Sequence, residues 1–209
     1  MRQRPAAILV LLLTTLAGLA FDSSAYLPSE KTFYLRGDGS ACPPDRWLGT
    51  AAGSGEPACG YAGGAPAGEL HHAGVVADTV NHFSTRTAPN LRLDANRDIV
   101  GTNRIAATAQ TNRNAVGRVR VDVTVHGSFQ GGGSGVLGTH SGTVDWIPGQ
   151  TSGEVDFPFT VDVPDEHDGR VITQLHIDVD IRGWHVLTGY HRLDGQSRFT
   201  LPTWVPKPT

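Results

Sequence analysis

The chain has 209 residues, with 17 Lys and Arg against 20 Asp and Glu, so its formal net charge is −3 when the histidines are neutral. A charge this small and scattered offers no basic surface to phosphate groups, and we expect no nucleic acid partner. The length fits one ordinary domain.

The N-terminus has the pattern of a secretory signal peptide. Arg2 and Arg4 precede an uncharged run over residues 6–21, and small residues follow up to Ala25. The run is shorter than the roughly 20 residues that span a bilayer, so an uncleaved membrane anchor is the less favoured alternative. We therefore expect residues 1–25 to be removed, with cleavage after Ala20 as the alternative to Ala25. The mature protein is then secreted or associated with the cell envelope, with no stable membrane span.

Two cysteines, Cys42 and Cys59, follow in the exported part of the chain. In an oxidising compartment we expect them to pair. Two free thiols or a metal pair are the alternatives. The segment between them is rich in Pro, Gly and small residues, and a cross-link across a loop of this size contributes about 3 kcal/mol in the chain-entropy model. Residues 26–84 are predicted to form a first strand at 32–36 and a disulfide-stapled arm. Residues 69–84 fit neither a helix nor a strand period well.

Three stretches alternate apolar and polar residues with a period of two, which is typical of half-buried strands. They are residues 118–126, 154–163 and 173–182. The last of these is expected near the middle of an antiparallel sheet, beside the first. In that arrangement Arg120 would face Asp178 or Asp180 in a surface pair. Pro158 cannot donate to a ladder, so its strand is predicted to lie at an edge or to carry a bulge.

Shorter extended stretches complete the pattern, at 91–93, 99–110, 144–147, 184–193 and 198–203. The glycine-rich run 127–142 is predicted to be a flexible connection. The count of eight or nine strands without a long helix favours an all-β fold, an antiparallel β-sandwich of which the jelly roll is one form. The sandwich core is assigned to residues 85–204, and residues 205–209 form a tail. In general outline this is similar to the accessory sandwich domains of secreted bacterial carbohydrate-active proteins, although no motif carries the similarity.

Two groups of side chains are candidate metal ligands. The first is His71, His72, Asp78 and His82, in which Asp78 and His82 would share one face of a helix, and imidazoles with a carboxylate suit zinc. The second is Asp94, Asn96 and Asp98, whose alternate spacing matches the first positions of a calcium loop. Ile99 and Ile105 stand where that loop needs Gly and Glu, so a polar turn is the alternative interpretation. The acidic turn 162–168 is a further calcium candidate, and no other cofactor is predicted.

An aromatic edge is the candidate binding surface, formed by Trp146, Trp184, Tyr190 and His191. Such rings can stack on sugars, although tryptophans of a sandwich commonly serve its core. The favoured function is a non-catalytic binding or cell-surface role, with a polysaccharide or a cell-surface component as partner. The alternatives are a secreted metal-assisted hydrolase that uses the His71 group, and a structural or assembly protein.

Overall fold

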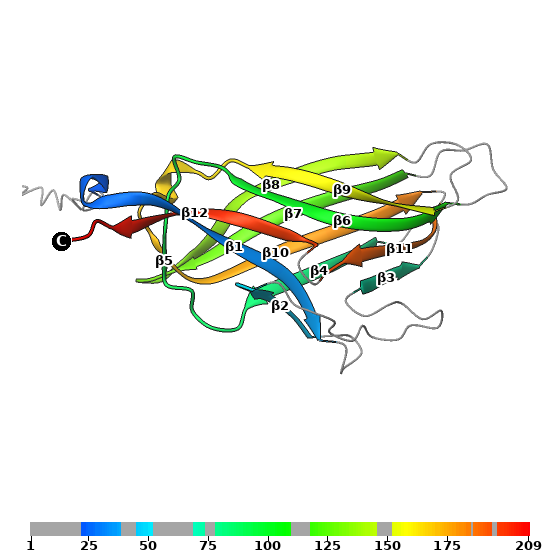
Figure 1. Ribbon diagram of the computed structural model, residues 1–209, viewed down its shortest axis with the longest axis horizontal. Coiled ribbons are helices and arrows are strands. Elements are labelled where there is room, and N and C mark those ends of the chain that lie inside the picture. The colour runs from blue at the N-terminus through cyan, green and yellow to red at the C-terminus, as the bar shows by residue number, and fades with distance from the viewer. Residues whose placement is uncertain are drawn as a thin grey trace, which may run out of the picture.

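The computed structural model describes residues 22–38, 45–51, 69–73, 78–109, 118–145, 152–184, 186–193 and 196–209. Over these ranges the chain forms twelve strands and two single-turn 3-10 helices, Ser23–Ala25 and Asp165–His167 (Figure 1). The prediction of an all-β fold is confirmed. The strands are β1 (Tyr26–Asp38), β2 (Asp45–Gly49), β3 (Glu69–Ala73), β4 (Asp78–Thr85), β5 (Leu91–Leu93), β6 (Ile99–Ala109), β7 (Arg118–Phe129), β8 (Ser134–Asp145), β9 (Ser152–Val161), β10 (Val171–Trp184), β11 (Val186–Arg192) and β12 (Arg198–Pro206).

All the described strands belong to one hydrogen-bonded network, where the sequence predicted eight or nine strands in a sandwich. The order is β3-β11-β6-β12-β1-β2-β4-β10-β7-β8, and β9 pairs with β6. The short β5 pairs with both β10 and β12, so the strands from β12 to β10 close into a ring. The pairing of β2 with β4 is parallel, and the other described pairs are antiparallel. No helix among the described residues is long and apolar enough to cross a membrane.

The strand predicted to be central is confirmed as β10, which lies between β4 and β7. The four aliphatic residues of its alternating stretch 173–182 and the four valines of β7 are all at most 3% exposed, as the alternation predicts. The register differs from the predicted one, because Arg120 lies opposite Arg182 and Asp122 lies opposite Asp180. The prediction that Arg120 faces Asp178 or Asp180 is therefore wrong.

The glycine-rich run is the largest local difference from the sequence prediction. It is not a flexible connection, because β7 continues to Phe129 and β8 begins at Ser134, with a tight turn between them. Gly132, in that turn, has a φ of +98°. The other glycines make room for the core: a Cβ on Gly138 would lie 2.3 Å from the Val161 side chain. The glycines of this run thus allow β8 to pack closely on β9.

Pro158 lies in β9, which pairs with β6 alone among the described strands. The predicted edge position of this strand is confirmed, since the missing N–H of proline leaves no gap in a ladder there.

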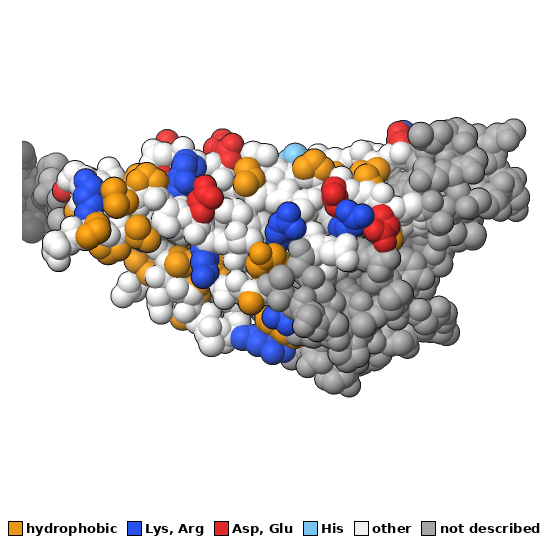
Figure 2. Space-filling model, viewed as in Figure 1, with side chains coloured by type: hydrophobic (Ala, Val, Ile, Leu, Met, Phe, Trp, Pro, Cys, Tyr) orange, Lys and Arg blue, Asp and Glu red, His pale blue; other side chains and the backbone are white. Residues whose placement is uncertain are grey.

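Strands from the first 84 residues form hydrogen bonds within the same sheet network as the later strands. In the strand order β1, β2 and β4 lie between β12 and β10. Cys42 and Cys59, predicted to form the disulfide, lie outside the described residues. On the face that Figure 2 shows, charged side chains of both signs are spread over the surface, and several hydrophobic side chains gather at the left end of the view.

Candidate metal centre

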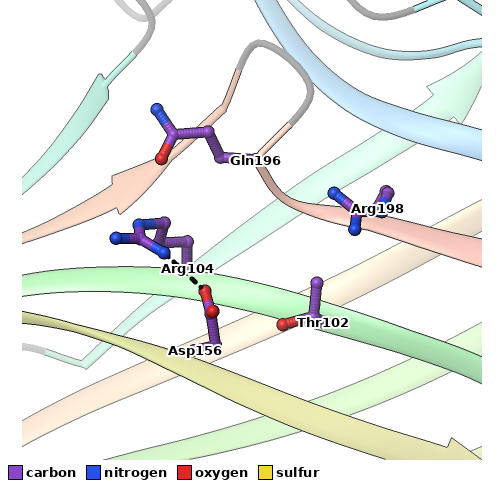
Figure 3. Close-up of a pocket in the computed structure, with 5 residues that line it drawn as sticks. All are labelled: Thr102, Arg104, Asp156, Gln196 and Arg198. Atoms are coloured by element: carbon purple, nitrogen blue, oxygen red, sulfur yellow. Dashed lines mark hydrogen bonds and ion pairs between the residues drawn. The ribbon is translucent and has the colours of Figure 1, made fainter.

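A polar notch with a volume of about 270 Å³ lies on the outer surface of β6, β9 and β12 (Figure 3). Arg104 is fixed in it: its Nε and Nη2 donate to Glu154 Oε2 at 3.0 and 2.9 Å, and its Nη1 donates to Asp156 Oδ1 at 3.1 Å. The hydrogen bond to Glu154 and the charge of Asp156 raise the pKa of Arg104 above its ordinary value. The notch is lined by Thr102, Arg104, Asp156, Gln196 and Arg198. None of these residues belongs to a site that the sequence predicted.

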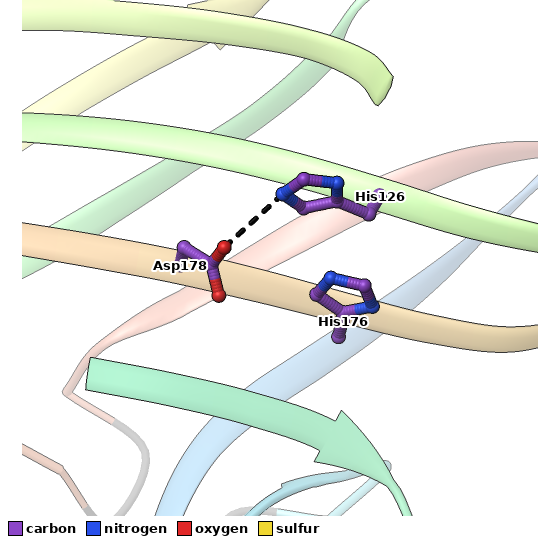
Figure 4. Close-up of side chains that lie close together, drawn as sticks. All are labelled: His126, His176 and Asp178. Atoms are coloured by element: carbon purple, nitrogen blue, oxygen red, sulfur yellow. Dashed lines mark hydrogen bonds and ion pairs between the residues drawn. The ribbon is translucent and has the colours of Figure 1, made fainter. Parts of the chain in front are cut away.

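A second polar group lies on the outer face of β4, β10 and β7 (Figure 4). His126 of β7 and His176 of β10 are opposite each other in the register, and their rings stack with centroids 4.2 Å apart. Asp178, two residues further along β10, lies on the same face and accepts from His126 Nε2 at Oδ2, 3.1 Å away. The ligand atoms of these three side chains all lie within 4.8 Å of one another.

His82 of β4 completes this group from the other side of β10. It is opposite Asp178 in the register, and its Nδ1 lies 2.5 Å from Asp178 Oδ1. The two carboxylate oxygens of Asp178 therefore contact one histidine each. The Asp178 side chain is 22% exposed and that of His82 is 71% exposed, so the carboxylate is sheltered beneath an accessible imidazole.

The group has the chemistry of a zinc ligand set, and one of its ligand separations has the matching spacing. Two ligands bound at about 2.0 to 2.2 Å in a tetrahedron lie roughly 3.3 Å apart, and His126 Nε2 and Asp178 Oδ2 are close to that separation. Burial, followed by the charge of His126, lowers the pKa of His176 below its ordinary value, which favours the neutral ring. Neutral imidazole is the form that binds a metal ion.

Of the predicted zinc ligands, the structure brings only His82 into this group. His71 and His72 lie in β3, which pairs with β11, whereas β4 pairs with β10. Asp78 and His82 lie in a strand instead of a helix, so their Cα atoms are about 13 Å apart, too far for one ion. The ambiguity between helix and strand is therefore resolved as a strand over Asp78–Thr85, so the helical face on which Asp78 and His82 were expected to meet is not formed. The side chains of His71, His72 and Asp78 lie outside the described ones, and a metal site that includes them stays a prediction.

The predicted calcium positions form a hydrogen-bonded turn. Asp94 is 1% exposed, and its Oδ1 accepts from the Asn96 backbone N–H and side-chain amide, while its Oδ2 accepts from Arg97 Nε at 2.7 Å. Asp98 is exposed. In the acidic turn, Asp168 Oδ1 accepts from Ala95 N and Trp204 Nε1, both at 3.0 Å. These contacts stabilise the turn at residues 94–98 and join it to the acidic turn at 162–168. Calcium binding at either turn remains a prediction.

The predicted aromatic edge is described only in part. His191 is fully buried and its Nε2 lies 3.1 Å from Asn103 Oδ1, so it is no part of an exposed platform. Trp184 and Tyr190 lie in β10 and β11, and Trp146 lies outside the described residues.

One feature of the sequence could have indicated the group of His126, His176 and Asp178. His126 and His176 occupy polar positions of two alternating strands that were expected to be neighbours. The register that places the two rings together is not encoded in the alternation, because any even shift preserves the buried face.

No family model matches the chain, and neither does any curated protein. Among solved structures it is similar to infectious bursal disease virus, Gt strain, at 13% identity and a TM-score of 0.25, covering 88% of this chain and 63% of that one. It is also similar to the unassembled VP1 pentamer of KI polyomavirus, at 10% identity and a TM-score of 0.22, covering 90% of this chain and 97% of that one. The chain thus spans less than two thirds of the first structure, and TM-scores of this size carry no functional argument.

Proposed function

We propose that this protein binds a divalent transition-metal ion, with zinc as the best match, through His126, His176 and Asp178. The observation that supports this most is the meeting of the three ligand atoms within 4.8 Å on two directly paired strands. Two imidazoles and a carboxylate are ordinary zinc ligands, and three protein ligands leave a fourth position for water or another donor. Because both strands are long and central, the sheet holds the ligands in place.

His82 has a positioning role in this proposal. Its ring nitrogen holds Asp178 Oδ1, which leaves Oδ2 directed toward His126. A partner of this kind orients a ligating carboxylate, and its loss typically lowers metal affinity about 10- to 100-fold.

The proposal is tested by calorimetric titration of the chain with zinc chloride. We expect one ion per chain, loss of measurable binding in His126→Ala and in His176→Ala, and a weaker site in His82→Ala. His140→Gln is the matched control, because His140 lies on β8 and its Nδ1 contacts the Thr160 carbonyl instead. Zinc binding of equal strength in His126→Ala and the unaltered chain would contradict the proposal.

We propose export as the setting of this function, since Arg2, Arg4 and the uncharged run after them support a cleaved signal peptide. The 3-10 turn ends at Ala25 and β1 begins at Tyr26, so cleavage after Ala25 would remove no residue of β1. The strand ladder therefore starts directly after the preferred cleavage site.

A structural or assembly role is the second candidate function. Leu27 and Val205 are opposite each other on β1 and β12, and they are 42% and 40% exposed. Side chains directly opposite on paired strands share a face, so they form one small apolar surface. The occupant we expect is a second copy of this chain. Analytical ultracentrifugation should show a concentration-dependent oligomer that Leu27→Ser weakens, and a monomer at every concentration would rule the role out.

A further inference from the structure

The polar notch on β6, β9 and β12 is independent of the metal centre, which lies on β4, β7 and β10. The strand registers place two of its residues, Arg198 and Thr102, in one row that crosses four strands. Tyr34 of β1 is opposite Arg198, Arg198 is opposite Thr102, and Thr102 is opposite Pro158. Three strand spacings separate the ends of this row, roughly 14 Å. The row therefore extends one strand beyond the notch, on the side of β1.

The next position along β6 and β9 adds the pair Arg104 and Asp156, which are directly opposite and hydrogen-bonded. Arg104 also donates its backbone N–H to the buried Ser197 Oγ at 3.0 Å, so both its main chain and its side chain are fixed. A guanidinium held in this way loses little conformational entropy when a ligand binds. Gln196 is exposed beside it, at the start of the segment that leads into β12.

The balance of charge and hydrogen-bonding groups indicates the class of ligand. Arg104 is paired with two carboxylates, Glu154 and Asp156, and Arg198 lines the notch as a second guanidinium. With two charges of each sign, the surroundings favour neither an anion nor a cation strongly. Donors and acceptors are mixed, since the arginines donate, the carboxylates accept and the Gln196 amide does both. A hydroxyl group also donates and accepts, so a ligand with many hydroxyls matches this set, whereas phosphate needs an excess of donors.

The size of the notch agrees with a ligand of this kind. A volume of about 270 Å³ is just below the usual range of pockets for drug-sized ligands, so the notch suits a small ligand or one unit of a larger one. The ring of Tyr34, half-buried at one end of the row, offers an apolar surface with a polar tip. A sugar ring has the same combination of apolar faces and a polar edge.

We propose that the notch binds one neutral sugar residue of a glycan whose chain lies across β1, β12, β6 and β9. Gln196, Arg104 and Asp156 contact its hydroxyl groups, and Arg198 and Tyr34 lie beneath the neighbouring residue. This site differs from the predicted aromatic edge in every residue. It does not depend on zinc, because no residue is shared between the two sites.

The test is a nuclear magnetic resonance titration of the isotope-labelled full-length chain with three neutral trisaccharides, maltotriose, cellotriose and chitotriose. We expect at least one to shift the amide signals of Thr102, Gln196 and Arg198 in a saturable way, with or without a chelator. Gln196→Ala should weaken that binding about threefold to tenfold, the loss of one or two neutral hydrogen bonds. Gln130→Ala, at the exposed turn between β7 and β8, is the matched control and should bind normally.

Two results would overturn the proposal. One is the absence of saturable shifts at these amides with all three sugars. The other is a stronger response of the same amides to inorganic phosphate, which would make the notch an anion site. Gln196 is exposed, so its replacement should leave the fold intact, and the dispersion of the spectrum verifies this.

Discussion

Only glycine fits at position 138, because β8 and β9 pack too closely there to leave room for a Cβ atom. Its φ is +149°, and a Cβ there would lie 2.3 Å from Val161 Cγ1 and 2.7 Å from the Asp162 carbonyl oxygen. We expect Gly138→Ala to lower the free energy of unfolding by about 2 to 4 kcal/mol, through overpacking and backbone strain together. Chemical denaturation monitored by tryptophan fluorescence measures the change.

Gly132→Ala is the matched control for that substitution. Gly132 also has a positive φ, but nothing lies within 4 Å of its Cβ position, so only the backbone strain remains. If the two variants lost equal stability, the contact with Val161 would not be the cause.

The charged ladder on β7 and β10 shows how two strands avoid the repulsion of like charges. Asp122 lies opposite Asp180 and Arg120 opposite Arg182, and each arginine turns to the aspartate of its own strand, at 2.9 and 2.7 Å. Burial alone would raise the pKa of Asp122, yet the hydrogen bonds from Ser141 and Arg120 and the charges of Arg120 and Arg182 lower it below its ordinary value. The ladder therefore stabilises the ionised form of Asp122.

A definite pH dependence follows from this lowered pKa. A carboxyl whose pKa is lower in the folded than in the unfolded state stabilises the fold above the unfolded pKa, and loses that contribution as pH falls through the folded one. Asp122→Asn should therefore be less stable than the unaltered chain at neutral pH and should lose less stability below about pH 4. Thermal unfolding across this range measures the difference, and Asp98→Asn, on an exposed turn, should follow the unaltered chain.

The elements differ in how much of them the sequence reveals. Alternation locates β7, β9 and β10 well, because one face of each strand is buried throughout and period two is the direct consequence. It fails for β8, where Gly135, Gly138 and Gly142 take inward positions that would carry large apolar residues in an ordinary strand. Val161 and Phe157 of β9 fill the space at Gly138 and Gly142, and His167 lies nearest to Gly135. These contacts are visible only once the segments are placed together. The high glycine content of this segment therefore predicts a loop, although the chain forms strand β8 there.

The candidate metal centre was only partly predictable for a related reason. His82 was singled out by its neighbours in sequence, whereas its partners His126, His176 and Asp178 come from strands that are distant along the chain. Chemistry that depends on three strands requires their registers, and residue types alone do not supply them. The notch on β6, β9 and β12 was not predicted at all, since its residues are common surface residues until the strands align them.

At the scale of the whole molecule, the proposed export makes a prediction about the N-terminus. Cleavage after Ala25 leaves Tyr26 as the first residue, at the beginning of the ladder between β1 and β12. N-terminal sequencing of the chain recovered from the medium or periplasm of an expressing bacterium should begin at Tyr26. A start at Phe21 would favour the alternative site, and recovery of the uncleaved chain in the cytoplasm alone would contradict export.

The pairing of β1 with β12 also has a consequence for folding. Nine residue pairs, from Tyr26 with Pro206 to Tyr34 with Arg198, join the beginning of the described chain to its end. β1 is synthesised long before its partner β12 and has to wait for it, so folding is limited by contacts of very large sequence separation. Until β12 arrives, the edge of β1 is open to other chains, so the molecule has its greatest tendency to aggregate during synthesis.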